Sequence, residues 1–196
     1  MMPPGSGRPG RPVLLQTERF ALRSLKPIDA PERWVKWLKD PEVMGPLNSP
    51  LRQSTTQELR AHIASADNNE RYLIGIFDLA TQVQIGFFMI EVELVHRRAT
   101  FNVVIGEKAW WGKDVVNETR AALLDEFFND RGVDKAMGMP LARNFPAIFN
   151  YKAQGWRHEG TLRGHCLSIT DGSRLDQLQF GISKTEWFEK RGKNRR

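Results

Sequence analysis

The sequence has very little cysteine: Cys166 is the single one among 196 residues. One cysteine excludes a disulfide within the chain and a cluster of thiolates around a metal ion. The four histidines do not form the helical pair with an intervening acid that is typical of a zinc site. We therefore expect no metal centre.

Long apolar runs are also missing. No stretch approaches the roughly 18 apolar residues that a membrane-spanning helix needs. Residues 1–12 are rich in proline, glycine and arginine and lack the apolar centre of a secretory signal. These features predict a cytoplasmic protein without membrane contact.

The formal net charge of +6 comes from the two ends of the chain. Residues 1–12 carry two arginines and no acid, and residues 190–196 carry five basic side chains. The remainder is close to neutral, which argues against a nucleic-acid-binding surface. If the segment KRGKNRR did bind nucleic acid, binding would weaken steeply with salt and disappear when that tail is cut.

The length and the 40% apolar content suit one domain with a substantial core. We expect a disordered leader over residues 1–12, one domain over 13–189 and a basic tail over 190–196. Apolar periodicity in the first half predicts strands and amphipathic helices. The strands are expected at 13–25, 72–79, 84–94 and 99–106, and the helices at 29–40 and 55–66.

The second half predicts a helix over 114–129, with Gly132 as its stop. One broad apolar face of this helix is expected to hold Val116, Leu123, Leu124, Phe127 and Phe128. A short strand (135–141), a helix (144–154) and a hairpin around the turn TDGS follow. The pattern indicates a mixed sheet covered by helices, hence α/β or α+β. Its βαβ unit would bind a small ligand at the strand ends and the helix N-terminus.

Five segments, in order, resemble the GNAT superfamily of N-acetyltransferases. The branch is that of the ribosomal-protein alanine N-acetyltransferases and many small-amine or amino-sugar acetyltransferases. The segments are TERFALRSL, DPEV, IGEKAWWGKDVVNETRAALLDEFF, ARNFPAIFNYKAQGWRHEGTLR and TEWF. The resemblance runs from about residue 14 to residue 188. It implies a single GNAT-like domain with a mixed, mostly antiparallel sheet of about seven strands, flanked by helices and splayed at the cofactor cleft.

The resemblance also implies acetyl-CoA as co-substrate, with its pyrophosphate on the loop before the central helix. In the family, that loop has Arg or Gln, two residues, Gly, one residue, then Gly or Ala. Trp111, Asp114 and Val116 take these places. Backbone N–H groups point at the phosphates, and glycine lets the backbone approach closely. The expected cofactor-binding residues are Val104, Ile105, Gly106, Trp111, Gly112, Lys113, Asp114, Val115, Val116, Asn117 and Asn144.

Asp114 allows two interpretations. As an N-cap, its carboxylate would accept from the amide of Val116 or Asn117. A carboxylate a few Å from a diphosphate would also repel it by about 1–4 kcal/mol. Lys113 could compensate, as could a backbone that turns the carboxylate outward.

The assignments of Tyr151 and Asn144 follow from the same resemblance, whereas those of Glu91 and Glu93 follow from strand periodicity. Tyr151 matches the tyrosine that protonates the leaving thiolate, although it could instead pack as a core ring. Asn144 matches the residue that holds the coenzyme, although it could be a helix cap only. For a general base, Glu91 and Glu93 share one face of their strand, which borders the expected acceptor cleft; the alternative is a solvated face.

The predicted function is therefore N-acetyl transfer from acetyl-CoA to a primary amine by direct attack in a ternary complex. The acceptor could be a protein N-terminus, an amino sugar or another small amine. The alternative is a non-catalytic GNAT fold that binds a CoA-like ligand or a protein partner, which Asp114, Val116 and Ala147 motivate. The resemblance is compatible with a homodimer.

Overall fold

The computed structural model describes residues 10–29, 32–51 and 53–193. They form eight strands: β1 Leu14–Gln16, β2 Phe20–Ser24, β3 Arg71–Asp78, β4 Gln84–Glu93, β5 Arg98–Ile105, β6 Lys135–Gly138, β7 Arg157–Leu167 and β8 Arg174–Ser183. The α-helices are α1 Glu32–Lys39, α2 Pro41–Met44, α3 Thr56–Ala64, α4 Val115–Asp130, α5 Phe145–Ala153 and α6 Lys184–Lys193. Three short 3-10 helices are η1 Pro27–Asp29, η2 Gly45–Leu47 and η3 Lys108–Trp110.

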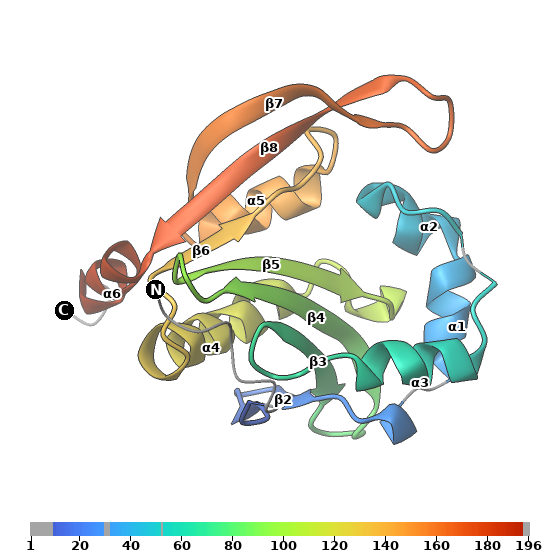
Figure 1. Ribbon diagram of the computed structural model, residues 1–196, viewed down its shortest axis with the longest axis horizontal. Helices are drawn as coiled ribbons and strands as arrows, with labels where there is room; N and C mark the ends of the chain where they lie inside the picture. The colour runs from blue at the N-terminus through green and yellow to red at the C-terminus, as the bar shows by residue number, and fades with distance from the viewer. Residues whose placement is uncertain (1–9, 30–31, 52, 194–196) are drawn as a thin grey trace.

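All eight strands belong to one sheet, in the order β1-β2-β3-β4-β5-β6-β8-β7 (Figure 1). Only β5 and β6 pair in parallel, so the expected mixed and mostly antiparallel α+β fold is confirmed. The sheet has one strand more than predicted because residues 13–25 form a hairpin. The amide of Thr17 donates to the carbonyl of Phe20 at 2.8 Å, which reverses the chain between β1 and β2.

The two parallel strands pair over three residues only. Their register runs from Arg98 opposite Lys135 to Thr100 opposite Met137, whereas β5 continues to Ile105. Beyond this point the strands diverge, as Figure 1 shows between β5 and the β6–β8 side of the sheet. Pro140 follows β6 and has no N–H to donate to a neighbouring strand. The divergence is the splay expected from the sequence.

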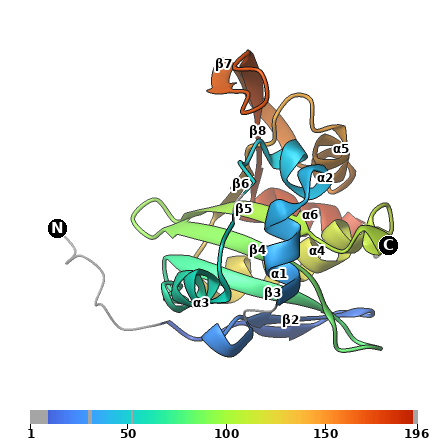
Figure 2. The same ribbon diagram turned by 90° about the vertical axis from the view of Figure 1, so that its right-hand side faces the viewer.

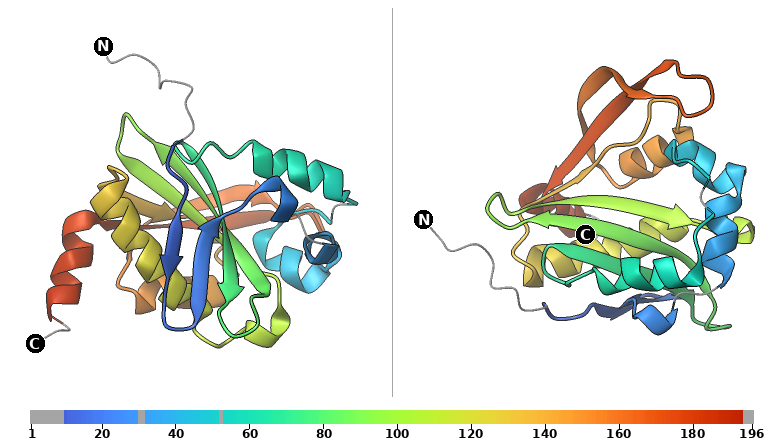
Figure 3. Two further views of the ribbon diagram at one scale, coloured as in Figure 1. Left: turned by 90° about the horizontal axis from the view of Figure 1, so that it is seen from below. Right: turned by 45° about the vertical axis from the view of Figure 1, so that its right-hand side comes forward.

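The core has two parts, because alternate residues of a strand point to opposite faces of the sheet. On β4, Phe88 packs in the larger cluster with α4 residues such as Phe127. Its neighbour Phe87 packs in the second cluster with Trp34 and Trp37 of α1. Figures 2 and 3 show α1 to α3 and α4 at different sides of the sheet. The helices thus cover both faces and leave the strand ends near the splay accessible.

Helix α4 differs in phase from the prediction. Its buried residues are Val115, Thr119, Arg120, Leu123, Leu124, Phe127 and Phe128. Val116 is half-buried, and Val115 takes the buried place at the start of the helix. The buried face of α4 also includes one basic side chain, that of Arg120.

Both ends of the predicted domain continue into residues assigned to the leader and the tail. Arg11 pairs with Glu126 at 3.0 Å. Helix α6 runs past residue 189, and Arg191 pairs with Asp125 at 2.5 Å. The rest of the predicted leader (1–9) and tail (194–196) lies outside the described residues. No helix in the described part of the chain is both long and apolar enough to cross a membrane.

Candidate active site

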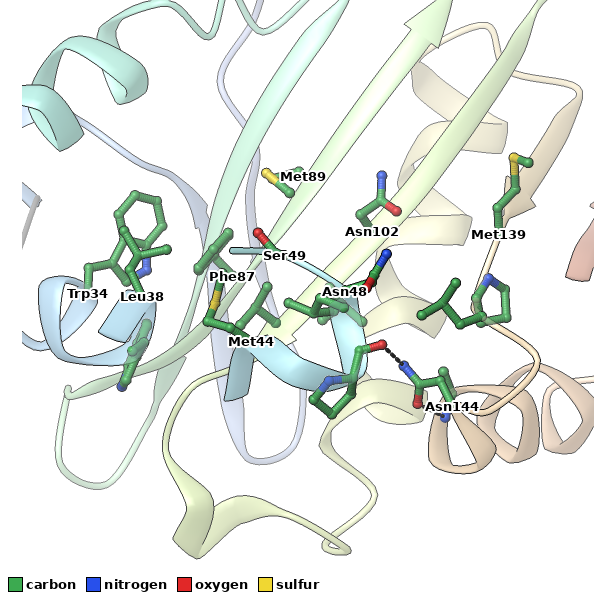
Figure 4. A pocket seen from close by; sticks show the side chains of 18 of the residues that line it. Trp34, Leu38, Met44, Asn48, Ser49, Phe87, Met89, Asn102, Met139 and Asn144 are labelled. Atoms are coloured by element: carbon green, nitrogen blue, oxygen red, sulfur yellow. Dashed lines mark hydrogen bonds between the residues drawn. The ribbon is translucent and has the colours of Figure 1, made fainter. Parts of the chain in front are cut away.

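A cavity of about 1090 Å³ lies at the splay, between the sheet and helices from both halves of the chain. Figure 4 shows its walls: Trp34, Leu38 and Met44 from α1 and α2, Phe87 and Met89 from β4, Asn102 from β5, and Met139 and Asn144 from the opposite side. Asn48 joins η2 to the β7–β8 hairpin by donating to Leu167 O at 2.7 Å and accepting from Ile169 N at 3.1 Å. The cavity is thus closed by segments far apart in sequence.

The described walls of this cavity carry little charge. Glu58 is their only carboxylate, and they include no lysine or arginine. The carboxylate of Glu58 already accepts from Thr55 N at 2.7 Å and Thr55 Oγ1 at 3.2 Å, in the capping box of α3. The indole N–H of Trp34 is buried and has no hydrogen-bond partner among the described residues. The cavity therefore suits a ligand with an apolar body better than one with several charges.

Tyr151 of α5 reaches the cavity from the splay. Its side chain is buried, and its hydroxyl donates to the carbonyl of Phe101 at 3.3 Å, one residue beyond the last β5–β6 pair. Its ring stacks on Phe180 at 5.1 Å. A methyl group built on Gly138 would lie 2.0 Å from the hydroxyl oxygen, so only glycine leaves room for it. Burial raises the pKa of Tyr151, and the charge of Arg120 opposes that rise.

Asn144 combines two contacts at the start of α5. Its Oδ1 accepts from the amide of Ala147 at 3.2 Å, as a helix cap does. Its Nδ2 donates to Pro46 O at 3.1 Å, which links α5 to η2 across the cavity (Figure 4). The side chain is therefore a cap that also lines the cavity.

The backbone conformation of Asp114 is one that favours glycine, the residue that the resembled family has at this point of the loop. Its φ and ψ are 60° and 18°, the left-handed conformation that glycine adopts without penalty and aspartate tolerates better than most residues. Its carboxylate makes no N-cap hydrogen bond and accepts instead from Asn117 Nδ2 at 2.7 Å. The predicted cap to Val116 or Asn117 is thus wrong, because the left-handed backbone directs the side chain to the Asn117 amide group.

The first-turn amides of α4 remain available as donors. Residues Val115 to Asn117 have no carbonyl one turn earlier within the helix. Such N–H groups, aligned with the positive end of the helix dipole, are an anion site. The donor set therefore fits a pyrophosphate, and the Asp114 carboxylate is an opposing charge beside it.

Glu118 fixes this helix start to the first hairpin. Its carboxylate accepts from Thr17 Oγ1 at 2.6 Å, Arg19 N at 2.9 Å and Arg19 Nε at 2.7 Å. Arg19 also donates from Nη2 to Lys113 O at 3.0 Å. Burial would raise the pKa of Glu118, but these donors lower it below its usual value. Residues 17–19 (TER) thus orient the loop before α4.

The other predicted cofactor residues occupy the end of β5 and the loop. Val104 lines the cavity. Ile105 O accepts from Trp111 Nε1 at 2.8 Å, and Gly106 lies against the ring of Trp37, which a methyl group would meet at 2.0 Å. Residues 111–117, including exposed Gly112 and Lys113, do not line the cavity itself.

Glu91 and Glu93 lie on the same face of β4 as Phe87 and Met89, but are exposed and do not line the cavity. Glu93 accepts from both Nε and Nη2 of Arg98, at 2.8 and 2.9 Å, and this pair lowers its pKa. A carboxylate held ionised in this way is a weak base.

Sequence reasoning missed two residues of this site, Arg120 and Gly138. A charged side chain within the apolar stripe of a helix was the available signal for Arg120. Gly138 had no local signal, since its role depends on Tyr151 crossing from another element. Among the described residues, no group of three histidine, cysteine, aspartate or glutamate side chains could hold a metal ion.

The comparisons with known proteins agree with this geometry. Residues 19–157 match the family described as Acetyltransferase (GNAT) domain. No curated protein matches the sequence. Solved structures do match the fold. A GNAT-family acetyltransferase from Bacillus anthracis has a TM-score of 0.76 at 15% identity, covering 89% of this chain and all of that one.

Two further matches are acetyltransferases with a named acceptor. A spermidine N-acetyltransferase from Vibrio cholerae, in complex with CoA and spermine, has a TM-score of 0.76 at 19% identity, covering 87% of this chain and 98% of that one. A ribosomal-protein-S5-alanine acetyltransferase from Vibrio fischeri has a TM-score of 0.75 at 15% identity, covering 89% and 98%. At these identities the likeness concerns the fold. The family match covers most of the chain, and the protein belongs to the GNAT family, as an enzyme that transfers the acetyl group of acetyl-CoA.

Proposed function

We propose that this enzyme acetylates a primary amine in the cavity by direct attack on the thioester, with Tyr151 as the general acid. The observation that carries this proposal is the buried Tyr151 hydroxyl at the splay of β5 and β6, facing the cavity. Acyl transfer needs a neutral amine, donors for the carbonyl oxygen and a proton for the sulfur. Tyr151 supplies that proton.

The coenzyme's place follows from the donors described above. The amides of Val115 to Asn117 would hold the pyrophosphate, and Asn144 and Val104 would contact the arm that leads toward Tyr151. When bound, acetyl-CoA supplies the activated acetyl group. The residues of the chain bind it, orient it and deliver the proton.

The amine must lose a proton before it attacks. Of the two predicted bases, Glu91 is the better candidate, because Glu93 is engaged by Arg98. Glu91 shares its face of β4 with Met89, which lines the cavity. We therefore assign Glu91 the role of taking the proton through solvent.

Replacing Asp114 by glycine is expected to tighten acetyl-CoA binding by about tenfold or more. It removes a repulsion worth about 1–4 kcal/mol and lets the backbone approach the phosphates more closely. Calorimetric titration with acetyl-CoA and CoA measures the change and tests the proposed coenzyme site.

Asp114→Asn separates the effect of charge from that of the backbone, because asparagine tolerates the same backbone conformation and its side-chain oxygen still accepts from Asn117. Equal gains for Asn and Gly would assign the effect to charge alone. If neither the natural protein nor either variant binds acetyl-CoA, this site is not the coenzyme site, and the non-catalytic alternative gains support.

For the acceptor, we propose a monoamine with an apolar body rather than a polyamine. Glu58 is the single carboxylate of the described walls and is already engaged by Thr55. A second ammonium group without a partner would lose hydration without compensation. We expect kcat/KM for an arylalkyl monoamine to exceed that for spermidine by at least about tenfold, a difference of 1.4 kcal/mol.

Glu58→Gln is the matched variant for this prediction. It leaves monoamine turnover unchanged if Glu58 acts only as part of the α3 capping box. Preferred acetylation of spermidine, lost in Glu58→Gln, would contradict the proposal and make Glu58 the polyamine-recognising group.

A further inference from the structure

Arg120 is the most deeply buried cation of the described residues, with 1% of the residue's surface exposed. Its guanidinium lies between two aromatic rings, 4.4 Å from the centroid of Tyr151 and 5.1 Å from that of Trp156. Its Nε donates to Gln154 Oε1. Its Nη2 is buried without a hydrogen-bond partner, and no carboxylate pairs with the guanidinium in the described part of the chain.

Such an arrangement is costly for a merely structural residue. A buried charge without a counter-charge loses hydration, and burial lowers the pKa of Arg120 to about 10. The neighbouring buried positions of the helix hold apolar side chains such as Leu123 and Leu124. The unusual feature is therefore a positive charge next to the proposed acid.

A second arginine–tyrosine pair in the same protein differs in that its arginine has a carboxylate partner. Arg131 lies 5.6 Å from the ring centroid of Tyr72, the only other tyrosine. Arg131 is neutralised by Glu126 at 2.8 Å. Tyr72 thus faces a compensated ion pair, whereas Tyr151 faces an uncompensated cation.

The other contacts that the described residues make with Tyr151 involve uncharged groups. They are the Phe101 carbonyl, Gly138, Trp156 and Phe180. His158 lies against Phe180, at 5.5 Å between ring centroids. Arg120 is accordingly the charge that acts on the phenol.

We propose that Arg120 is a positioning residue that holds the Tyr151 ring and stabilises its phenolate during acetyl transfer. This inference rests on the proposed function. The amine nitrogen bonds to the acetyl carbon, the carbon–sulfur bond breaks with its electron pair left on the sulfur, and Tyr151 gives its proton to that sulfur. The phenolate then regains a proton from the attacking amine by way of solvent. A phenolate in a buried site is unfavourable unless a cation is near, and Arg120 is that cation.

The test uses the fact that the chain has two tyrosines. Tyrosine labelled with ¹³C at Cζ gives two NMR signals, which Tyr72→Phe assigns, and each signal titrates when its phenol ionises. Titrations cover the pH range over which circular dichroism shows an intact fold. We expect Arg120→Met to move the Tyr151 transition to higher pH and to leave Tyr72 unmoved, while Arg120→Lys stays close to the natural protein.

The same variants are compared in turnover. We expect kcat to fall by about tenfold or more in Arg120→Met, with its alkaline limb moved to higher pH, and KM for acetyl-CoA to stay within about twofold. Arg120→Lys should recover part of kcat. Arg131→Met, the matched control, should affect the Tyr72 signal only.

A Tyr151 signal that titrates identically in Arg120→Met and the natural protein would overturn the inference. A moved signal with unchanged kcat would overturn the role in proton transfer, while the electrostatic coupling stands. Should Arg120→Met not fold, Arg120→Gln removes the charge and keeps a donor toward Gln154. The NMR result does not require turnover, so it is separable from failure of Tyr151 as the acid.

Discussion

Replacing Tyr151 by phenylalanine is expected to lower kcat by about 10²- to 10⁴-fold, the usual contribution of a positioned general acid. The hydroxyl is the proposed proton donor to the sulfur, and phenylalanine retains the ring that stacks on Phe180. The lost hydrogen bond to Phe101 O should cost only about 0.5–1.5 kcal/mol of unfolding free energy. Steady-state kinetics and denaturant unfolding measure the two effects.

Tyr72→Phe is the control for this substitution. Tyr72 is equally buried, but belongs to β3 and does not line the cavity. It should lose a similar amount of stability and retain full turnover. Unchanged kcat in Tyr151→Phe would remove Tyr151 from the mechanism and leave proton transfer to solvent.

Adding one methyl group at Gly138 is expected to reduce turnover nearly as much as removing the Tyr151 hydroxyl. The new Cβ would lie 2.0 Å from the hydroxyl oxygen and 2.4 Å from Cζ, so the ring must move away from the splay. A displacement of about 1 Å in a reacting group can cost about 10²-fold in rate. The overpacking itself should cost about 1–3 kcal/mol of stability.

Gly160→Ala on β7 tests whether any glycine-to-alanine change in the sheet has this effect. No atom of the described residues lies within 4 Å of a methyl group built on Gly160, so turnover should be unchanged. If Gly138→Ala is as active as the natural protein, the hydroxyl position is less critical than proposed. If the double variant Gly138→Ala/Tyr151→Phe loses no more kcat than Tyr151→Phe alone, both substitutions remove the action of the same hydroxyl.

The order and type of most elements could be read from local patterns, although helices α2 and α6 were not predicted. The meander of β3 to β5, helix α4 and the β7–β8 hairpin follow from apolar periodicity and turn residues, which depend on near neighbours in the chain. The error at residues 13–25 came from a tight turn inside an alternating segment. The chain reverses through a hydrogen bond between Thr17 and Phe20. The alternation of apolar residues does not predict this bond.

The motif residues of the loop and of α5 were also recognisable in sequence, because their spacing reflects local backbone requirements. Asp114 shows the limit of that reasoning. Its position was identified, but its conformation decides which group its carboxylate meets, and the left-handed backbone turned it to Asn117 instead of the helix amides.

Only the tertiary structure decided which residues act together. Arg120 and Tyr151 belong to different helices, and Gly138 to a strand between them in sequence; they meet because β5 and β6 part and α4 and α5 pack beside the gap. The sequence by itself determined most of the secondary structure, the family resemblance and the candidate acid. The charge beside that acid and the space for its hydroxyl were set by packing between distant segments, which local periodicity does not encode.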